Sequence, residues 1–302
     1  MSTATTRSTS PTREAIKHAV LIIGALIVIL PFYVMVSYSL KSPKEIESNT
    51  GGFLGSQEAF VDEYCVKLGN EPDDCMVTPM VYNYTQAFKK APLLRYLLNG
   101  VIVTVSIFVL QILVALPCAY ALAKLPFKGR DFVFNMILFC LLIPVHAIAL
   151  PLYVMLAKLG LTNTYAALVI PWTISVFGIF LMRQFFKTVP DDLIDAARMD
   201  GLSELSIVWR VMVPTAIPAL MAFAIFSVVA HWNDYFWPRV VITGNQDLFT
   251  PPLGLRVFKG DADGSSWGPM MATATIIVTP LIVAFLLAQR RFIEGITLSG
   301  MK

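Results

Sequence analysis

Charged residues are scarce in this sequence, and their scarcity excludes a soluble globular protein. Asp, Glu, Lys and Arg make up 14% of the 302 residues, whereas apolar residues make up 56%. A soluble domain carries charge on about a quarter of its residues. An uncharged stretch of roughly 20 residues is long enough to cross about 30 Å of hydrocarbon as a helix. The composition therefore predicts an integral membrane protein.

Six stretches of this kind are present, and the only charged residue within them is Asp234, near one end of the fifth. They are residues 19–40, 96–123, 132–157, 159–182, 215–237 and 269–289. The alternating ten-residue pattern of a membrane β-barrel is missing, and a helix satisfies its backbone hydrogen bonds within its own segment. We therefore expect an all-α integral membrane protein with six transmembrane helices.

Basic residues accumulate on one side of the predicted spans. They precede the first span, fill the turn after the second, surround residues 183–210 and close the chain: Arg7, Arg13, Lys17, Lys124, Lys128, Arg130, Arg183, Lys187, Arg198, Arg210, Arg290, Arg291 and Lys302. Lys and Arg are enriched in cytoplasmic loops, so both termini are predicted to be cytoplasmic. No small-residue cleavage site stands out before Lys41, and we expect an uncleaved first span.

These predictions divide the chain into five parts. A cytoplasmic tail (1–17) leads into the first transmembrane helix (18–40), which is followed by a periplasmic loop (41–94). A core of five transmembrane helices (95–290) precedes a second cytoplasmic tail (291–302). Within the core, a charged cytoplasmic segment connects the fourth span to the fifth.

Cysteine is also rare, with four residues in the chain. Cys118 and Cys140 lie within predicted spans, where a thiol packs as a small apolar side chain. Cys65 and Cys75 lie in the long outer loop, where a disulfide would stabilise a segment with little core of its own. Whether these two form a disulfide or remain free thiols stays open. No metal-binding spacing of Cys or His is present.

The sequence lacks an obvious energy source for uphill transport. The nearest ionisable candidates for coupling to an ion gradient are His146, which could equally be a hydrogen-bonded interior histidine, and Asp234, which lies toward the outer face, so such coupling is poorly supported. No phosphate-binding loop of the G-x-x-x-x-G-K-[ST] kind is present, so nucleotide hydrolysis by that route needs a partner. The stretch "GSSWG" matches the G-x-S-x-G pattern of serine hydrolases, but its flanks do not predict the required strand before Ser266. We expect a loop there.

The stretch "DAARMDGLSELSIVWRVMVP", residues 195–214, is unusually charged for this chain. Pro190 precedes it, and Asp191 or Asp192 is expected to cap a short helix. Gly201 is suited to a left-handed turn that ends this helix, and Ser203 to the cap of a second one. The pattern predicts a helix-turn-helix on the cytoplasmic surface.

Two functions fit this segment. Small side chains at Ala196 and Ala197 would let another protein approach closely, and Asp195, Arg198 and Asp200 would supply polar contacts. The segment would then be a docking site. The alternative is an amphipathic connector that rests on lipid headgroups.

The spacing D-A-A, three residues, Gly, nine residues, V-x-V-P resembles the EAA motif of ABC importer permeases, E-A-A-x3-G-x9-I-x-L-P. Ala196, Ala197, Gly201 and Pro214 match, and Asp195 replaces the usual Glu. The resemblance extends to carbohydrate-importer permeases of the MalG type through the stretches "NGVIVTVSIFVLQILVALPCAYALAKLPFKGRD", "IPVHAIALPLYVMLAKLGLTNT", "LMRQFFKTVPDDLIDAARMDG", "WNDYFWP" and "QRRFIEGITLSGMK". The chain is thus similar to a type I (MetI/MalG-like) permease over most of its length.

This resemblance implies a non-catalytic subunit of an ATP-driven importer for a sugar or sugar derivative in a bacterial inner membrane. Its implied partners are two ATP-binding subunits, a second, MalF-like permease, a periplasmic solute-binding protein and membrane lipids, with no nucleic acid. The chain itself binds no cofactor, and ATP with Mg²⁺ is used by the ATPases. Residues 190–214, hereafter the coupling segment, would contact an ATPase through Asp195, Ala196, Ala197, Arg198, Asp200, Gly201 and Pro214.

A polar and aromatic cluster ends the fifth predicted span: His231, Trp232, Asn233 and Asp234. Such groups suit a sugar pathway, but Trp and polar residues also gather at any membrane interface. Two rival functions remain: a self-sufficient carrier or channel, and an ABC permease for a solute other than a carbohydrate.

Overall fold

A computed structural model describes residues 11–258 and 267–299. Ser266, the first ten residues and the last three lie outside the described residues. The chain forms two compact units: Met1–Lys90 with Phe258–Ile276, and Ala91–Val257 with Ile277–Lys302. We refer to them as unit 1 and unit 2.

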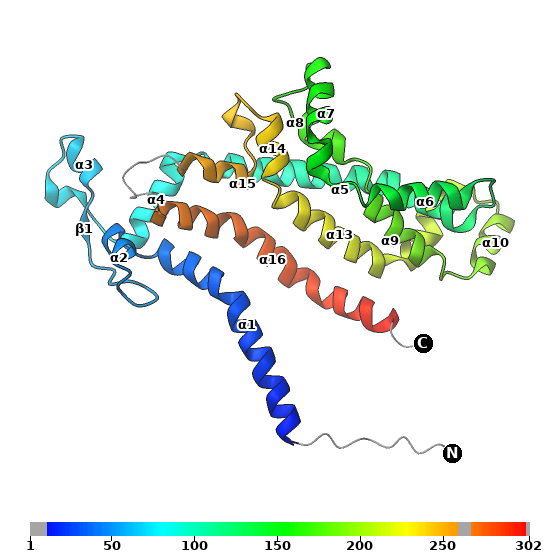
Figure 1. The fold of residues 1–302 in the computed structure, drawn as a ribbon, viewed down its shortest axis with the longest axis horizontal. Coiled ribbons are helices and arrows are strands. Elements are labelled where there is room, and N and C mark those ends of the chain that lie inside the picture. Colours follow the sequence, from blue (N-terminus) through cyan, green and yellow to red (C-terminus); the bar gives the residue numbers. More distant parts are fainter. Residues whose placement is uncertain (1–10, 259–266, 300–302) are drawn as a thin grey trace. The chain divides into compact units, whose positions relative to one another are not determined.

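Helices make up most of the fold, as the sequence predicts (Figure 1). The α-helices are α1 (Pro11–Ser39), α2 (Pro43–Glu47), α3 (Glu63–Lys67), α4 (Pro79–Lys90), α5 (Leu93–Lys124), α6 (Arg130–Cys140), α7 (Val145–Lys158), α8 (Tyr165–Val169), α9 (Val176–Phe186), α10 (Asp191–Met199), α11 (Glu204–Ile207), α12 (Val213–Thr215), α13 (Ile217–Trp232), α14 (Phe236–Val241), α15 (Pro251–Gly254) and α16 (Trp267–Ser299). A π-helix spans Val208–Met212, and short 3-10 helices span Pro72–Cys75, Ile170–Trp172, Gln246–Leu248 and Leu255–Phe258.

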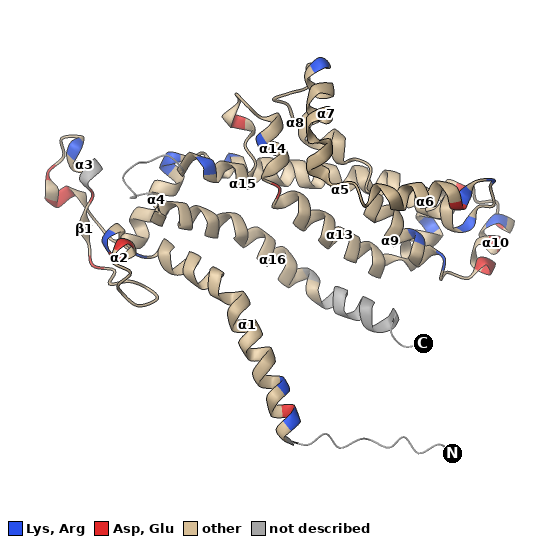
Figure 2. Ribbon diagram, viewed as in Figure 1, with Lys and Arg blue, Asp and Glu red and all other residues tan. Residues whose placement is uncertain are grey.

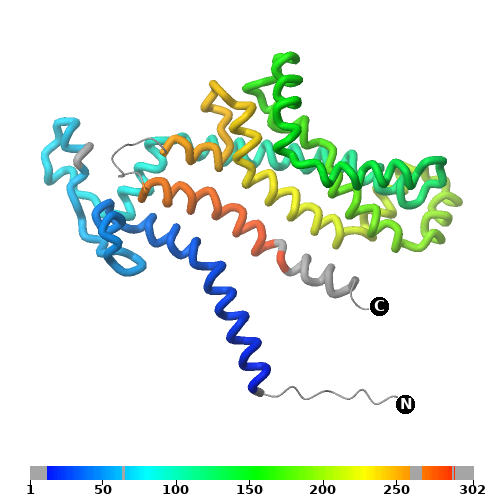
Figure 3. Tube along the Cα trace, in the orientation of Figure 1, coloured from blue at the N-terminus to red at the C-terminus, as the bar shows by residue number. Residues whose placement is uncertain are grey.

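Within the described residues, four helices are long and apolar enough to cross a membrane, or up to six if each of two bent pairs counts as one span. The four are Thr12–Ser39, Leu93–Lys124, Tyr165–Phe186 and Trp267–Leu287. The predicted third span (132–157) is broken within its length, and a second bend lies at the start of the predicted fifth span (215–237). α6 and α7 meet at 96° near Pro144, and the helix that ends at Thr215 meets α13 at 88° beside Pro214 and Pro218. Figure 3 shows α7 leaving α6 at this sharp angle. Proline removes a backbone donor and crowds the preceding turn, which favours such breaks.

Unit 1 combines α1 with the outer segment and the first turns of α16. None of the apolar window of α1 is buried within the chain, so this helix depends on lipid or on a partner for cover. In the outer segment, β1 (Phe60–Val61) pairs antiparallel with β2 (Met76–Val77). The structure joins Cys65 and Cys75 next to this ladder in a disulfide. The Asn83 amide of α4 donates to the backbone carbonyls of Ser39 and Lys41 at 3.0 and 2.8 Å and ties the segment to the end of α1.

Unit 2 is built around α5, α9 and α13. A Cβ placed on Gly178 of α9 would lie 2.4 Å from the ring of Phe223 on α13, so glycine is what allows these helices to approach. A second apolar cluster joins the end of α5 to the coupling segment. Cys118 and Cys140 are exposed within this chain. Lipid accommodates small apolar side chains as well as a protein core does.

Charged residues of unit 2 gather at the end that carries α10 and the turn before α6 (Figure 2). The middle of α5 and the length of α13 carry no charge, and single charged residues recur at the tip of α7 and around α14. The coupling segment therefore lies where a membrane-spanning unit meets water.

Candidate functional site

α10 begins the coupling segment, and its start differs from the prediction. Pro190 occupies the N-cap position, and neither Asp191 nor Asp192 caps the helix through its side chain. Instead, the Asp191 carboxylate accepts a hydrogen bond from Lys124 at 2.6 Å. This bond holds the pKa of Asp191 below its usual value. The two carboxylates still lie in the first turn, where the helix dipole favours negative charge.

The turn after α10 agrees with the sequence prediction. Gly201 has a φ of 78°, a left-handed conformation in which glycine avoids strain. The Ser203 side chain then caps α11 by accepting a hydrogen bond from the Ser206 amide. A π-helix continues from α11 as far as Met212, and Pro214 lies in α12 directly after it.

One face of α10 packs against its own chain. Ile194 and Ala197 are buried against Ala119 and Tyr120 at the end of α5, together with Ile207 of α11. Ala197, only 5% exposed, therefore does not present its small side chain to a partner as the sequence suggested. Its size lets α10 lie close to unit 2.

The opposite face of α10 is open. Leu193 is 47% exposed and Met199 is 85% exposed, and Ala196 is exposed as well. These apolar side chains lie outside the candidate spans, in a segment rich in charge.

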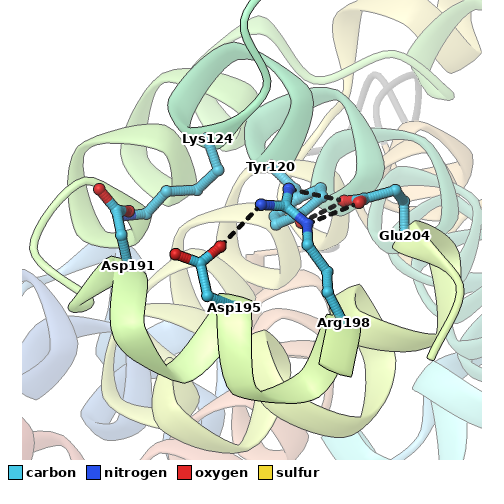
Figure 4. A network of polar contacts seen from close by, with 6 residues as sticks. All are labelled: Tyr120, Lys124, Asp191, Asp195, Arg198 and Glu204. Atoms are coloured by element: carbon cyan, nitrogen blue, oxygen red, sulfur yellow. Dashed lines mark hydrogen bonds and ion pairs between the residues drawn. The ribbon is translucent and has the colours of Figure 1, made fainter. Parts of the chain in front are cut away.

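A chain of polar contacts links the coupling segment to α5 (Figure 4). Arg198 donates to Asp195 at 3.1 Å and, through two nitrogens, to both carboxylate oxygens of Glu204 at 2.8 and 3.3 Å. The hydrogen bond to Glu204 raises the pKa of Arg198, so this guanidinium stays charged. Glu204 also accepts a hydrogen bond at 2.5 Å from the hydroxyl of Tyr120, which belongs to α5.

Asp195 and Arg198 are thus paired within the segment, although the sequence suggested that they contact a partner. Asp200 is exposed and has no ion pair within the described part of the chain. Sequence reasoning missed Tyr120, Lys124 and Glu204. The available signal was a Tyr and a Lys four residues apart at the end of an apolar helix.

The predicted pathway residues do not converge. Trp232 is buried and its indole donates to the Ile277 carbonyl at 3.1 Å, while Asp234 accepts from the Trp237 amide at 3.1 Å. Asn233 is exposed and donates to the Val229 carbonyl at 2.9 Å. His231 lies 3.1 Å from the amide nitrogen of Gln111. These hydrogen bonds fix the end of α13 and the turn that follows it.

Gln111 lies in the middle of α5 and was overlooked because it carries no charge. Its amide donates to the Trp172 carbonyl at 2.9 Å and accepts from the Ser227 hydroxyl at 2.6 Å. This buried group connects α5, α13 and the 3-10 helix at Trp172. Among the described side chains, no group of three or more His, Cys, Asp and Glu could hold a metal ion.

Comparison with known proteins gives consistent matches. The family model described as "Binding-protein-dependent transport system inner membrane component" matches residues 111–297. An arabinooligosaccharides transport system permease protein of Halalkalibacterium halodurans is 37% identical over 68% of this chain and 72% of its own. An sn-glycerol-3-phosphate transport system permease protein of Brucella abortus is 30% identical over 95% and 96%. A diacetylchitobiose uptake system permease protein of Streptomyces coelicolor is 30% identical over 94% and 87%.

Solved structures show the same fold. A chain of a bacterial ABC transporter involved in the import of the acidic polysaccharide alginate covers 96% of this chain, with all of its own length aligned, a TM-score of 0.76 and 23% identity. A second match, at a TM-score of 0.55 and 14% identity, comes from a bacterial alginate ABC transporter in complex with an alginate pentasaccharide-bound periplasmic protein.

Proposed function

Because this chain belongs to the family of inner-membrane components of binding-protein-dependent transport systems, we propose that its coupling segment docks on an ATPase and drives import of a sugar or sugar derivative. Two ATPase subunits use ATP with Mg²⁺ on the cytoplasmic side. A second, MalF-like permease completes the pathway, and a periplasmic binding protein delivers the solute. Both termini of this multi-pass chain are cytoplasmic.

The observation that carries this proposal is the open face of α10. Leu193, Ala196 and Met199 are exposed apolar side chains on a segment in which Asp195, Arg198 and Glu204 are paired with one another. Water is a poor environment for exposed apolar side chains, whereas an apolar cleft of a protein covers them favourably. The docking surface is therefore Leu193, Ala196 and Met199, together with Asp200 and Gly201 at the turn, rather than the paired Asp195 and Arg198.

The sugar assignment is supported by the relatives named for arabinooligosaccharides and diacetylchitobiose. A third relative is named for sn-glycerol 3-phosphate, which is a polyol phosphate and not a sugar. Of the residues suggested for the pathway, Asn233 is exposed and His231 is partly exposed. Buried Trp232 and the turn-forming Asp234 support them by fixing the end of α13.

The test is co-purification of the tagged chain from its native membranes in mild detergent, with Gly201→Arg as the variant. A side chain at Gly201 meets nothing within 4 Å in this chain, but any side chain strains the left-handed backbone there, so the variant needs a control that carries the same strain. Gly160→Arg is the matched control, because Gly160 also has a left-handed φ, of 69°, and open space around it.

We expect the wild type and Gly160→Arg to retain an ATPase and a second permease, and Gly201→Arg to lose the ATPase while still inserting into the membrane. A wild-type chain that purifies without an ATPase would contradict the proposal and favour a self-sufficient carrier.

A further inference from the structure

α5 holds the coupling segment at two points that lie one helical turn apart. Tyr120 and Lys124 are spaced i and i+4, so they project from the same face of the last turn of α5. Tyr120 bonds to Glu204 of α11, whereas Lys124 donates to the Val189 carbonyl at 2.5 Å and to Asp191 at the start of α10. Both helices of the segment are thus attached to one membrane helix.

The two side chains are buried, which makes their contacts well defined. Tyr120 is 2% exposed, and the Lys124 side chain is 7% exposed although its partner Asp191 lies at the surface. Exposed ion pairs hold geometry weakly. A hydrogen bond to a charged group from a buried donor is stronger and is costly to leave unmade. Tyr120 and Lys124 therefore fix orientation in a way that Arg198 and Asp195, at the surface, do not.

The apolar contacts between α5 and the coupling segment cannot fix this orientation alone. Ile194, Ala197 and Ile207 belong to an apolar cluster that includes the end of α5, and the hydrophobic effect is non-directional. With apolar contacts alone, a force on α10 could rotate the coupling segment relative to α5 without displacing α5. Directed bonds at both helices of the segment oppose this rotation.

We infer that Tyr120 and Lys124 are positioning residues that transmit movement of the coupling segment to α5, so that their loss separates ATP hydrolysis from opening of the membrane pathway. This inference rests on the proposed function. It assigns neither residue to docking, because both side chains face the interior of unit 2 and not the open face of α10.

The experiment uses the complete complex with its ATPase in proteoliposomes. A background with Cys118→Ala and Cys140→Ala removes the exposed free thiols, and Tyr235→Cys places a reporter just beyond α13, at a side chain that is 42% exposed. Phosphate release measures ATP hydrolysis. The rate at which a membrane-impermeant maleimide labels the reporter, with and without ATP and vanadate, measures the movement. The variants are Tyr120→Phe, Lys124→Met and both together.

Tyr165→Phe is the control, because it removes a tyrosine hydroxyl bond of similar length, to Asn99 at 2.6 Å, away from the coupling segment. We expect the parent and this control to show an ATP-dependent change in labelling. Tyr120→Phe and Lys124→Met should reduce that change several-fold while hydrolysis persists, the double variant should abolish it, and Lys124→Arg should restore most of it.

Three outcomes overturn the inference. If the Tyr120→Phe and Lys124→Met complexes keep the parent's full change in labelling, the two residues do not transmit movement. If they lose the ATPase subunit, the residues serve assembly instead. If the parent itself shows no ATP-dependent change, the proposed function fails and the inference fails with it.

Discussion

Ala196 and Ala197 are neighbours on α10 but face opposite surroundings. Ala197 is buried against the end of α5, and Ala196 is exposed between Leu193 and Met199. A small residue inward lets the helix lie close to its own chain, and a small residue outward lets a partner approach. One dipeptide therefore meets two separate steric demands, and substitutions at the two positions should fail in different ways.

A substitution of Met199 tests whether the exposed side of α10 contacts a partner. Fully burying a methionine side chain contributes roughly 1.5–3 kcal/mol, and about 1.4 kcal/mol corresponds to a tenfold change in affinity. We expect Met199→Glu to weaken ATPase binding by about tenfold or more, because it replaces the most exposed apolar side chain of the segment with a charge. Binding of purified ATPase to the detergent-solubilised chain gives the dissociation constant. Met76→Glu, at an exposed methionine of the outer segment, should leave it unchanged.

At the scale of single elements, the sequence predicts most helices but not where they break. Apolar stretches free of charge were sufficient to locate α1, α5 and α16. The 96° and 88° bends depend on how Pro144, Pro214 and Pro218 are accommodated by neighbouring helices, which one stretch of sequence does not reveal. The Gly201 turn was predictable because its cause is local. The contacts of Tyr120 and Lys124 were not, because their partners lie more than 60 residues away.

The close packing of α9 against α13 at Gly178 can be tested by substitution. Gly178→Leu would drive a side chain into the buried ring of Phe223, and overpacking of this kind costs typically 1–3 kcal/mol. We expect a lower melting temperature of the solubilised chain, measured by intrinsic fluorescence. Gly24→Leu in α1 is the control, because a side chain there meets nothing within 4 Å. Equal stability of the two variants would show that α9 and α13 do not pack as described.

For the whole molecule, the distribution of charged residues indicates which energy source drives transport. The predicted spans contain no charged side chain except Asp234, which forms a turn with the Trp237 amide. The buried polar group at Gln111 is uncharged, and its carbonyl and amide already have partners within the chain. Carriers driven by ion gradients rely on ionisable groups within the membrane. In the predicted spans the ionisable side chains are Asp234, His146 and His231, and His231 contacts the uncharged Gln111.

We therefore expect the uptake rate to depend on ATP and not on the ion gradient across the membrane. In cells or proteoliposomes that contain the complete transporter, we expect vanadate or depletion of ATP to abolish uptake of a labelled arabino-oligosaccharide, diacetylchitobiose or sn-glycerol 3-phosphate, whichever is accepted. A protonophore that leaves ATP levels intact should have little effect, because no proton or cation crosses with the solute. Uptake that stops with the protonophore while ATP is maintained would identify a carrier coupled to the ion gradient. His231 beside Gln111 would then be the first residue to examine as its proton-binding group, since it is the one histidine of the described spans that contacts a buried polar network.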